Sequence, residues 1–343
     1  MSKRQVAAAG AGSDTSRDST DALDARRGVG LFVGRFSMVG VLVLLIAVAM
    51  TLYPAFLKPA NVSNILTQNS AVGIIAAGMT FVIISGGFDL SVGATYALGG
   101  TLYAGLTLQT GSAVVGLLSG LAGGAIVGVA NGLIISRMNI NPFVATLGTS
   151  SIITGLAFVY SNSAPFIVTN KPSLVPAYQT LALTTIAGVL LPIWILIIVF
   201  VIAGILLAKT TYGRNVYAVG GNHEAAWLSG LRVKGLNASV YVLTGVLSGL
   251  AGMMDSSRLG VGQADVGGNL ALDAIAIVVI GGTSLLGGEG AMWRSVVGLL
   301  ILATLTNVFY SLNISQNWQL IAKGAIVVGA VSVDAMTRTR RRG

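Results

Sequence analysis

The 343-residue chain contains no cysteine, a single histidine and few charged side chains. Without cysteine it has no disulfide, no thiolate catalysis and no cysteine-based metal site. One imidazole does not make a metal site either, and we interpret His223, in a polar segment, as a solvated side chain. Charged residues make up only 9% of the sequence, whereas soluble domains carry about 25%. These shortages exclude an ordinary soluble domain.

Hydrophobic residues and glycine are abundant instead. The chain has 54% hydrophobic residues, a mean hydropathy of +0.84 and 46 glycines. Glycine at this frequency suits transmembrane helices, because small residues let two backbones approach closely. Ten apolar windows approach the roughly 20 residues of a helical span; they cover residues 38–57, 65–85, 90–108, 113–135, 143–160, 183–208, 238–256, 270–282, 293–311 and 318–335. We predict an all-α polytopic membrane protein with about ten transmembrane helices.

The remaining segments are polar. Residues 1–35 are rich in Ser, Thr, Asp and Arg, so we predict a disordered cytoplasmic tail, without a cleavable signal peptide. We assign residues 36–336 to one transmembrane domain, with a cytoplasmic loop at 209–237, and residues 337–343 to a basic cytoplasmic tail. The window at 270–282 is short and ends in glycines, which favours a re-entrant or broken helix.

Basic residues set the orientation. With a cytoplasmic N-terminus and ten spans, sixteen of the twenty Lys and Arg residues lie inside. Only Lys58, Lys171 and Arg258 lie outside, and Lys323 falls within a span. This asymmetry follows the positive-inside rule and predicts that both termini are cytoplasmic in an inner-membrane protein. It also explains the net charge of +9, so nucleic-acid binding is not expected.

Two glycine-rich motifs follow apolar windows. Residues 86–93 read GGFDLSVG and residues 281–288 read GGTSLLGG, sharing two leading glycines, a fifth leucine and an eighth glycine. Repeated halves with glycine-interrupted helices are typical of transporters, although glycine-rich turns also recur by chance. The candidate gating residues are Gly86, Gly87, Asp89, Gly93, Gly281, Gly282 and Gly288. Asp89 either caps the following helix or contacts substrate.

A third segment, GGNHEAAWLSGLRVK at residues 220–234, is polar and lies between two spans. It predicts a short helix that begins near Asn222 and is broken by Gly230. We expect such a helix to lie at the membrane surface, where a partner protein can bind it.

Several long motifs together resemble one protein family. They are GGFDLSVGA, GRNVYAVGGNHEAAWLSGLRV, SGLAGMMDSSRLG, LDAIAIVVIGGTSLLGGEG and QLIAKGAIVVGAVSVD, in order between about residues 60 and 335. They look like the permease subunits of bacterial ABC importers for ribose, xylose, arabinose and related sugars. The chain departs from the usual GIDLSVG pattern only at Phe88, which leaves Asp89 and the glycines in place.

The resemblance implies a type II ABC importer fold and several partners. These are a second permease chain (the same chain or a close paralogue), a cytoplasmic ATPase with two nucleotide sites, and a periplasmic sugar-binding protein, all at a lipid membrane. It implies that Glu224, Ala225, Ala226 and Gly230 form the coupling helix that sits in a groove of the ATPase. Otherwise Glu224 is a solvated carboxylate at a helix start.

The chain itself lacks an ATP site. The string nearest to GxxxxGK[ST], residues 203–210, has alanine at both glycine positions. We therefore expect no cofactor, no catalytic residue and no enzymatic activity in this chain, with ATP hydrolysed by the partner.

Three charged residues near the outer side need separate interpretations. Asp273 and Lys323 lie near the outer ends of their spans, so they either form an intramembrane pair or leave Lys323 to reach the headgroups beside Trp318. Arg258 either meets an acidic patch on the binding protein or holds headgroup phosphates.

Other functions fit less well. A secondary transporter needs acids at mid-membrane and an intramembrane hydrolase needs a base within the bilayer, and the sequence offers neither pattern clearly. Within the permease class the alternative substrates are branched-chain amino acids, nucleosides or a signalling sugar derivative. Polar residues either line the path or bond to neighbouring helices; they are Gln68, Asn69, Asn131, Thr146, Asn307 and Asn313.

Overall fold

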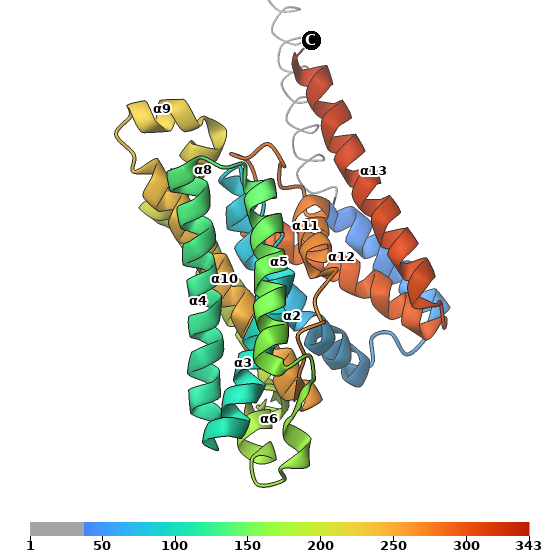
Figure 1. The fold of residues 1–343 in the computed structure, drawn as a ribbon. Helices are drawn as coiled ribbons and strands as arrows, with labels where there is room; N and C mark the ends of the chain where they lie inside the picture. Colours follow the sequence, from blue (N-terminus) through green and yellow to red (C-terminus); the bar gives the residue numbers. More distant parts are fainter. Residues whose placement is uncertain (1–37, 343) are drawn as a thin grey trace, which may run out of the picture.

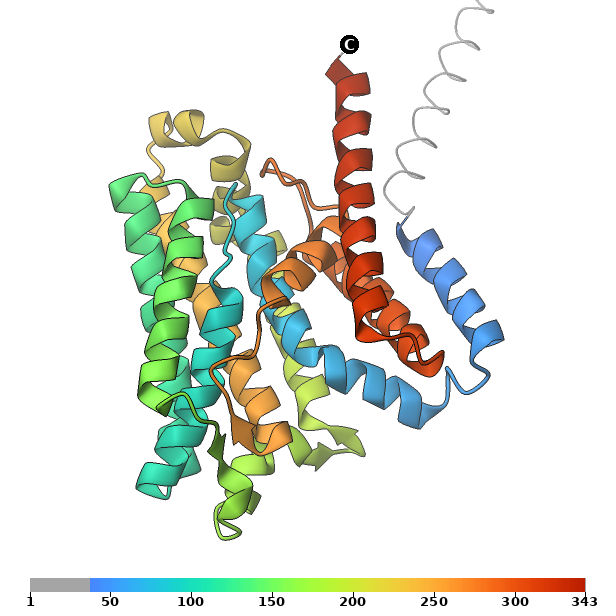
Figure 2. The same ribbon diagram turned by 45° about the vertical axis from the view of Figure 1, so that its right-hand side comes forward.

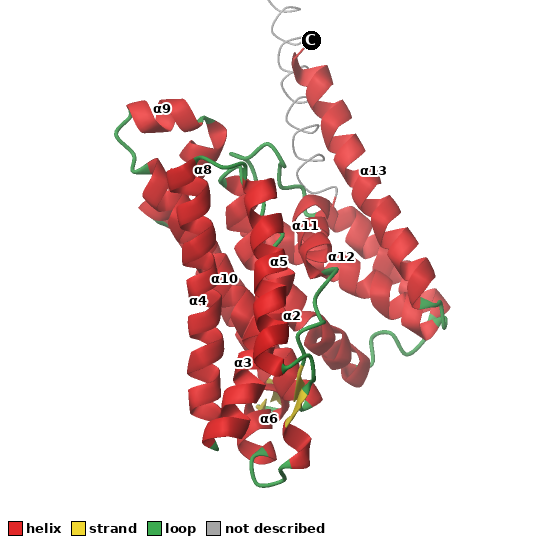
Figure 3. Cartoon of the chain, viewed as in Figure 1, coloured by secondary structure: helices red, strands yellow, loops and turns green. Residues whose placement is uncertain are grey.

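The computed structural model describes residues 38–342, so the expected tail at 1–35 lies outside the described residues. The described chain is a bundle of helices with four two-residue strands (Figures 1 and 3). The helices are Met38–Leu52, α2 (Pro59–Ile84), α3 (Val92–Thr110), α4 (Ala113–Met138), α5 (Pro142–Ser161), η1 (Val168–Asn170), α6 (Val175–Leu183), α7 (Leu191–Lys209), α8 (Thr211–Gly221), α9 (His223–Leu228), α10 (Val233–Leu259), α11 (Leu270–Ile280), α12 (Met292–Ser311) and α13 (Gln316–Arg342). The strands pair as β1 (Phe166–Ile167) with β4 (Val261–Gly262), and β2 (Thr185–Ile186) with β3 (Val189–Leu190), both antiparallel.

Helix α2 forms the centre of the bundle. Nearly all of its inner residues are buried, and it packs against α7, α10, α11 and α12 (Figure 2). Glycines allow some of these contacts, because a methyl group at Gly78 would lie 3.0 Å from the Cα of Thr244 on α10. A hydrogen bond between the hydroxyls of Thr80 and Ser295, 2.8 Å apart, ties α2 to α12.

Helices α4 and α10 pack through glycine. On α4, glycines recur every fourth residue, which places them in a stripe on one helix face; they are Gly116, Gly120, Gly124, Gly128 and Gly132. A methyl group at Gly128 would lie 2.5 Å from the carbonyl oxygen of Tyr241 on α10. The two backbones therefore touch without intervening side chains, as in small-residue contacts of membrane helices.

The outer faces of α4, α5 and α7 are apolar and exposed. Their exposed side chains include Leu118, Ile126, Val144, Leu156, Val159, Ile198 and Ile202. Six helices of the described residues are long and apolar enough to cross a membrane: α2, α4, α5, α7, α10 and α12. The prediction of an all-α polytopic membrane protein is therefore confirmed.

Each of the ten predicted windows overlaps a helix, but several boundaries were wrong; the window at 38–57, for example, passes the helix end at Leu52. The window at 183–208 begins too early, because α7 starts at Leu191. The residues before it end α6 and form the β2–β3 hairpin, whose turn holds Ala187 and Gly188 at positive φ. Composition did not reveal this hairpin, because most of its residues are apolar.

Helices α3 and α11 each follow an irregular segment within the bundle. Helix α11 has only 11 residues, about 16 Å at 1.5 Å per residue, which is about half of a bilayer core. The shortness predicted for the helix at 270–282 is therefore confirmed, and its re-entrant or broken character stays a prediction. The two segments meet at glycines, because a methyl group at Gly267 would lie 2.5 Å from the carbonyl oxygen of Gly93.

Candidate functional site

Helix α9 has the boundaries that the sequence predicts. The side-chain oxygen of Asn222 accepts a hydrogen bond from the Ala225 amide at 2.9 Å, which caps the helix start. At the other end Gly230 takes a φ of +82°, and its amide donates to the carbonyl of Trp227 at 2.9 Å. Glycine adopts this conformation without steric cost, so it turns the chain toward α10.

The two faces of α9 differ. Ala226 is buried with Val219 of α8 and Val233 of α10, so it fixes the helix to the body. Glu224 and Ala225 are exposed. Trp227 is 65% exposed and Leu228 is 72% exposed, an unusual placement for two large apolar residues outside the spans. Sequence reasoning passed over both, although large apolar residues on a short helix between spans signal a partner surface.

Helix α8 connects α9 to the bundle. We expected residues 209–221 to form part of a loop, but they fold as a helix whose start is capped by Thr210, which accepts from the Gly213 amide at 3.2 Å. Helices α8 and α9 lie at the same end of the bundle as the C-terminal end of α13 (Figure 1). The ends of α2 and α4 and the start of α10 line a cavity of about 300 Å³ there, together with His223.

The end of α8 touches both glycine motifs through backbone alone. We call this the glycine contact, formed by Gly86, Gly220, Gly287 and Gly288 around Ile84. The Gly288 amide donates to the carbonyl of Ile84 at 2.8 Å, which joins the end of α2 to the loop after α11. A methyl group at Gly220 would overlap that carbonyl oxygen, and one at Gly287 would lie 2.8 Å from the carbonyl oxygen of Gly220. Gly220, three residues before α9, is therefore held between the two motifs.

The motifs themselves share a helix ending, displaced by one residue from the sequence alignment. Gly86 after α2 and Gly282 after α11 both have a φ of +86°. Their amides donate to Ile83 and Val279 in the same pattern, at 3.0 and 2.8 Å. The sequence alignment pairs Gly86 with Gly281, but the structure pairs it with Gly282, because the position of the left-handed residue decides where each helix ends.

The other motif glycines are sites of close approach. A methyl group at Gly87 would overlap the hydroxyl of Tyr241, and one at Gly281 would overlap the carbonyl oxygen of Arg294. Gly93 meets Gly267 in the same way. The motifs thus hold α2, α3 and α11 against their neighbours.

Asp89 belongs to a buried polar network before α3. It is 2% exposed, and its Oδ1 accepts from the amide and hydroxyl of Ser91 at 2.9 and 2.6 Å. Asn131 of α4 donates to the Ser91 hydroxyl at 2.7 Å and accepts from Thr149 of α5 at 2.7 Å. Leu90 donates its amide to Thr146 at 3.0 Å. The network gives hydrogen-bond partners to polar groups of the irregular segment inside the bundle. Ser91, not Asp89, occupies the N-cap position of α3.

Asp273 and Lys323 lie together between α11 and α13. The Nζ of Lys323 lies 3.1 and 3.3 Å from the two carboxylate oxygens of Asp273. Both side chains are about one-fifth exposed. Trp318, beside which Lys323 would reach the lipid headgroups in the alternative interpretation, is exposed on α13.

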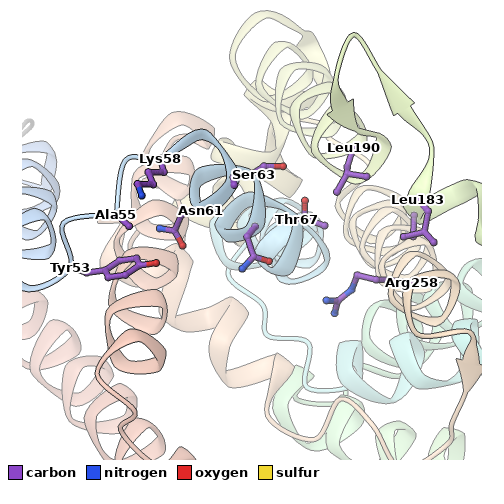
Figure 4. Close-up of a pocket in the computed structure, with 12 residues that line it drawn as sticks. Tyr53, Ala55, Lys58, Asn61, Ser63, Thr67, Leu183, Leu190 and Arg258 are labelled. Atoms are coloured by element: carbon purple, nitrogen blue, oxygen red, sulfur yellow. The ribbon is translucent and has the colours of Figure 1, made fainter.

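Arg258 lies in the last turn of α10, at the end of the bundle opposite α9. Its NH2 group lies 3.0 Å from Oδ1 of Asp255, and the hydroxyl of Tyr96 donates to Oδ2 of the same carboxylate at 2.8 Å. The arginine lines a cavity together with Lys58 and residues of α2 (Figure 4). Among the described residues no cluster of three or more His, Asp or Glu side chains is suited to a metal ion.

Comparison with known proteins gives a consistent result. A family model described as the permease component of the branched-chain amino acid transport system matches residues 61–331. The chain is 42% identical over 308 residues to the ribose import permease protein of Bacillus subtilis, covering 89% of this chain and 92% of that protein. It is 39% identical over 293 residues to the ribose import permease protein of Escherichia coli K12, covering 85% and 91%.

A further relative has a different named sugar. The chain is 36% identical over 318 residues to the L-arabinose ABC transporter permease protein of Azospirillum brasilense, covering 93% of this chain and 92% of that protein. No solved structure matches the chain. The family match spans most of the helices and both glycine motifs. This chain therefore belongs to the family of ABC transporter permease components that includes the ribose and arabinose import permeases.

Proposed function

We propose that this chain moves a monosaccharide across the inner membrane as the spanning subunit of an ATP-driven importer. A periplasmic binding protein delivers the sugar, and a cytoplasmic ATPase supplies the energy. The names of the ribose and arabinose relatives support the substrate class. The observation that carries the mechanism is the glycine contact, which ties the surface helix α9 to the helices at the centre of the bundle.

The orientation follows from charge at the two ends of the bundle. In this proposal the chain crosses the membrane ten times, with α11 and the irregular segment before it together making one crossing, and α9 and both termini lie in the cytoplasm. Arg137, Lys209 and Lys234 stand at the α9 end, in the last turns of α4 and α7 and the first turn of α10. Lys58 and Arg258 stand at the opposite end, which we place outside. The excess of basic residues at the α9 end agrees with the positive-inside rule.

The exposed face of α9 is the contact with the ATPase. Trp227 and Leu228 provide the apolar area that a groove would bury, and Glu224 adds a charge that selects the partner. Two copies of the permease, identical or closely related, place one α9 on each half of a two-site ATPase. ATP binds to that partner, and this chain contributes no nucleotide site.

Movement of α9 reaches the spans through backbone. Because Gly220 lies against Ile84 and Gly288, displacement of α8 and α9 shifts the end of α2 and the loop before α12 together. Tyr217 adds a second tie, since its hydroxyl donates to the carbonyl of Gly290 at 2.8 Å. A packed contact of this kind transmits a shift instead of absorbing it in side-chain rotation.

Substitutions on α9 test the coupling role. We expect Glu224→Lys and Trp227→Ala to reduce ATP-dependent sugar uptake by about tenfold or more, because charge reversal and loss of an apolar anchor each weaken an interface by about 2 kcal/mol. Gly230→Pro should abolish uptake, because proline cannot take the φ of +82° and lacks the amide that bonds Trp227. The measurement is uptake in proteoliposomes containing permease and ATPase, with the loaded binding protein added.

Two controls separate coupling from folding. Glu224→Gln keeps the side-chain size and should lose less activity than Glu224→Lys. Membrane insertion and copurification with the second permease chain should stay normal for the Glu224 and Trp227 variants, because both side chains point away from the bundle. Wild-type uptake by Glu224→Lys and Trp227→Ala would show that the ATPase contacts another surface.

A further inference from the structure

The cavity beside Arg258 is a polar space at the end of the bundle that we place outside (Figure 4). Its volume of about 620 Å³ lies within the range of about 300–1,000 Å³ that is usual for small-molecule sites. It is lined by Tyr53, Ala55, Lys58, Ala60, Asn61, Ser63, Asn64, Thr67, Ala182, Leu183, Leu190 and Arg258. Most of its polar lining comes from the first turns of α2.

Thr67 leaves an unsatisfied hydroxyl in the wall of this cavity. The side chain is 8% exposed, and its Oγ1 has no hydrogen-bond partner. The other threonine of α2, Thr80, bonds both to the carbonyl of Ala76 and to Ser295. Buried hydroxyls without a partner are rare in folded proteins. The Thr67 oxygen has almost no accessible surface, so a ligand in the cavity reaches it only after a small shift of the cavity wall.

Arg258 is held in position for a neutral ligand. Oδ1 of Asp255 accepts a hydrogen bond from Nε of Arg258 at 3.1 Å and lies 3.0 Å from its Nη2. The hydroxyl of Tyr96 on α3 donates to the other carboxylate oxygen, Oδ2. Asp255 carries the compensating negative charge, and Arg258, with five N–H donors, keeps some of them for the cavity. Figure 4 shows its guanidinium group directed into the space beside α2.

The amides on α2 are preorganised as well. Asn61 donates to the carbonyl of Phe56 at 2.8 Å and exchanges hydrogen bonds with Asn307 of α12. Asn64 accepts from Gln68 at 2.8 Å. Amides and hydroxyls both donate and accept, which is the chemistry that sugar hydroxyls require. Apolar residues of α6 and β3, Leu183 and Leu190, supply a surface for the carbon side of a sugar ring.

We propose that this cavity is a binding site for a neutral monosaccharide, occupied after the sugar leaves the binding protein and before it crosses the membrane. The proposal rests on the proposed function and adds the residues that hold the cargo, with Thr67, Asn64 and Arg258 in contact with sugar hydroxyls. Arg258 thereby acts on the sugar, and binding-protein docking is the alternative role that the experiment separates.

Thr67→Val tests the site, because it removes the hydroxyl and keeps the shape of the side chain. We expect the maximal uptake rate to fall about three- to tenfold, the loss typical of one hydrogen bond. The concentration of loaded binding protein that half-maximally stimulates the ATPase should stay unchanged. Thr110→Val is the matched control: its hydroxyl bonds to the carbonyl of Leu106 on the exposed end of α3, so uptake should stay at the wild-type rate.

Arg258→Gln distinguishes cargo from docking. A sugar contact predicts a lower maximal uptake with unchanged half-maximal binding-protein concentration. A rise in that concentration alone would assign Arg258 to docking and contradict the proposal at this residue. A wild-type complex that hydrolyses ATP but imports none of a panel of labelled monosaccharides, ribose and arabinose included, would instead contradict the proposed function itself.

A chemical test uses the absence of native cysteine. Asn64→Cys, labelled from outside with a small membrane-impermeant thiol reagent, should lose uptake while its ATPase remains stimulated by loaded binding protein. Labelled Thr110→Cys, exposed but away from the cavity, should transport normally. Full uptake by labelled Asn64→Cys together with full uptake by Thr67→Val would overturn the site.

Discussion

Replacing Gly220 with alanine should uncouple ATP hydrolysis from uptake. The added methyl group would overlap the carbonyl oxygen of Ile84 and lie 2.8 Å from the Gly288 amide nitrogen. Both neighbours are backbone atoms that cannot rotate away, so α8 must move off the end of α2. Overpacking of this kind costs about 1–3 kcal/mol, and separation of the contact removes the link from α9. We expect uptake to fall about tenfold or more.

Gly221→Ala is the matched control for this substitution. The two glycines are adjacent in α8, but a methyl group at Gly221 meets no atom within 4 Å. Uptake, ATPase stimulation and melting temperature should therefore stay near wild type, measured in the same reconstituted complex. Equal uptake by Gly220→Ala and Gly221→Ala would mean that the glycine contact does not transmit movement.

Gly128→Leu should prevent correct packing of the bundle. A side chain at this position would push against the backbone of α10. Even a single methyl group at Gly128 would lie 2.5 Å from the carbonyl oxygen of Tyr241 and 2.6 Å from the Cα of Val242. Helices α4 and α10 would have to separate along the glycine stripe, and the close backbone contacts at Gly124 and Gly132 would be lost as well. We expect destabilisation by about 3 kcal/mol or more, the upper end for overpacked cores.

The yield of monodisperse protein in detergent and its melting temperature measure this effect. Gly155→Leu provides the control, because Gly155 lies on the exposed face of α5 with open space around it. That variant should purify like the wild type. A stable Gly128→Leu permease with a normal melting temperature would contradict the close α4–α10 contact.

Local signals in the sequence predicted the parts of the fold that depend on neighbouring residues. Apolar windows located the long helices, because burial in lipid or core requires continuous apolar runs. Asn222 and Gly230 marked the ends of α9, since a side-chain cap and a left-handed glycine act within a few residues. The four-residue spacing of the stripe from Gly116 to Gly132 is also visible in the sequence, but only the overall glycine frequency was interpreted.

Other features depend on contacts between distant segments. The glycine contact joins Gly86, Gly220 and Gly288, and nothing near Gly220 in the sequence distinguishes it from Gly221. The burial of Ala226 on α9 was not predictable, because six residues are too few to show a helical period and the residues that cover it, Val219 and Val233, come from other helices. The one-residue displacement between the motifs reflects backbone conformation, which residue identity alone did not specify at consecutive glycines.

The outer cavity shows the same limit. Asn64, Thr67 and Arg258 come from two helices whose sequence positions give no hint of proximity. Polar residues such as Asn131, Thr146 and Asn307 were candidates for a sugar path, but the structure uses them to bond neighbouring segments. Three-dimensional placement was required to separate residues that support the bundle from residues that face open space.

If this chain is an importer subunit driven by a partner ATPase, sugar uptake must depend on ATP hydrolysis by that partner. The permease and its ATPase are reconstituted in proteoliposomes, and labelled ribose or arabinose is supplied with the sugar-binding protein. We expect accumulation only when ATP, ATPase and binding protein are all present, and at least about tenfold less accumulation with Gly220→Ala but not with Gly221→Ala. Sugar accumulation by the permease alone, driven by an ion gradient without ATP, would contradict this expectation.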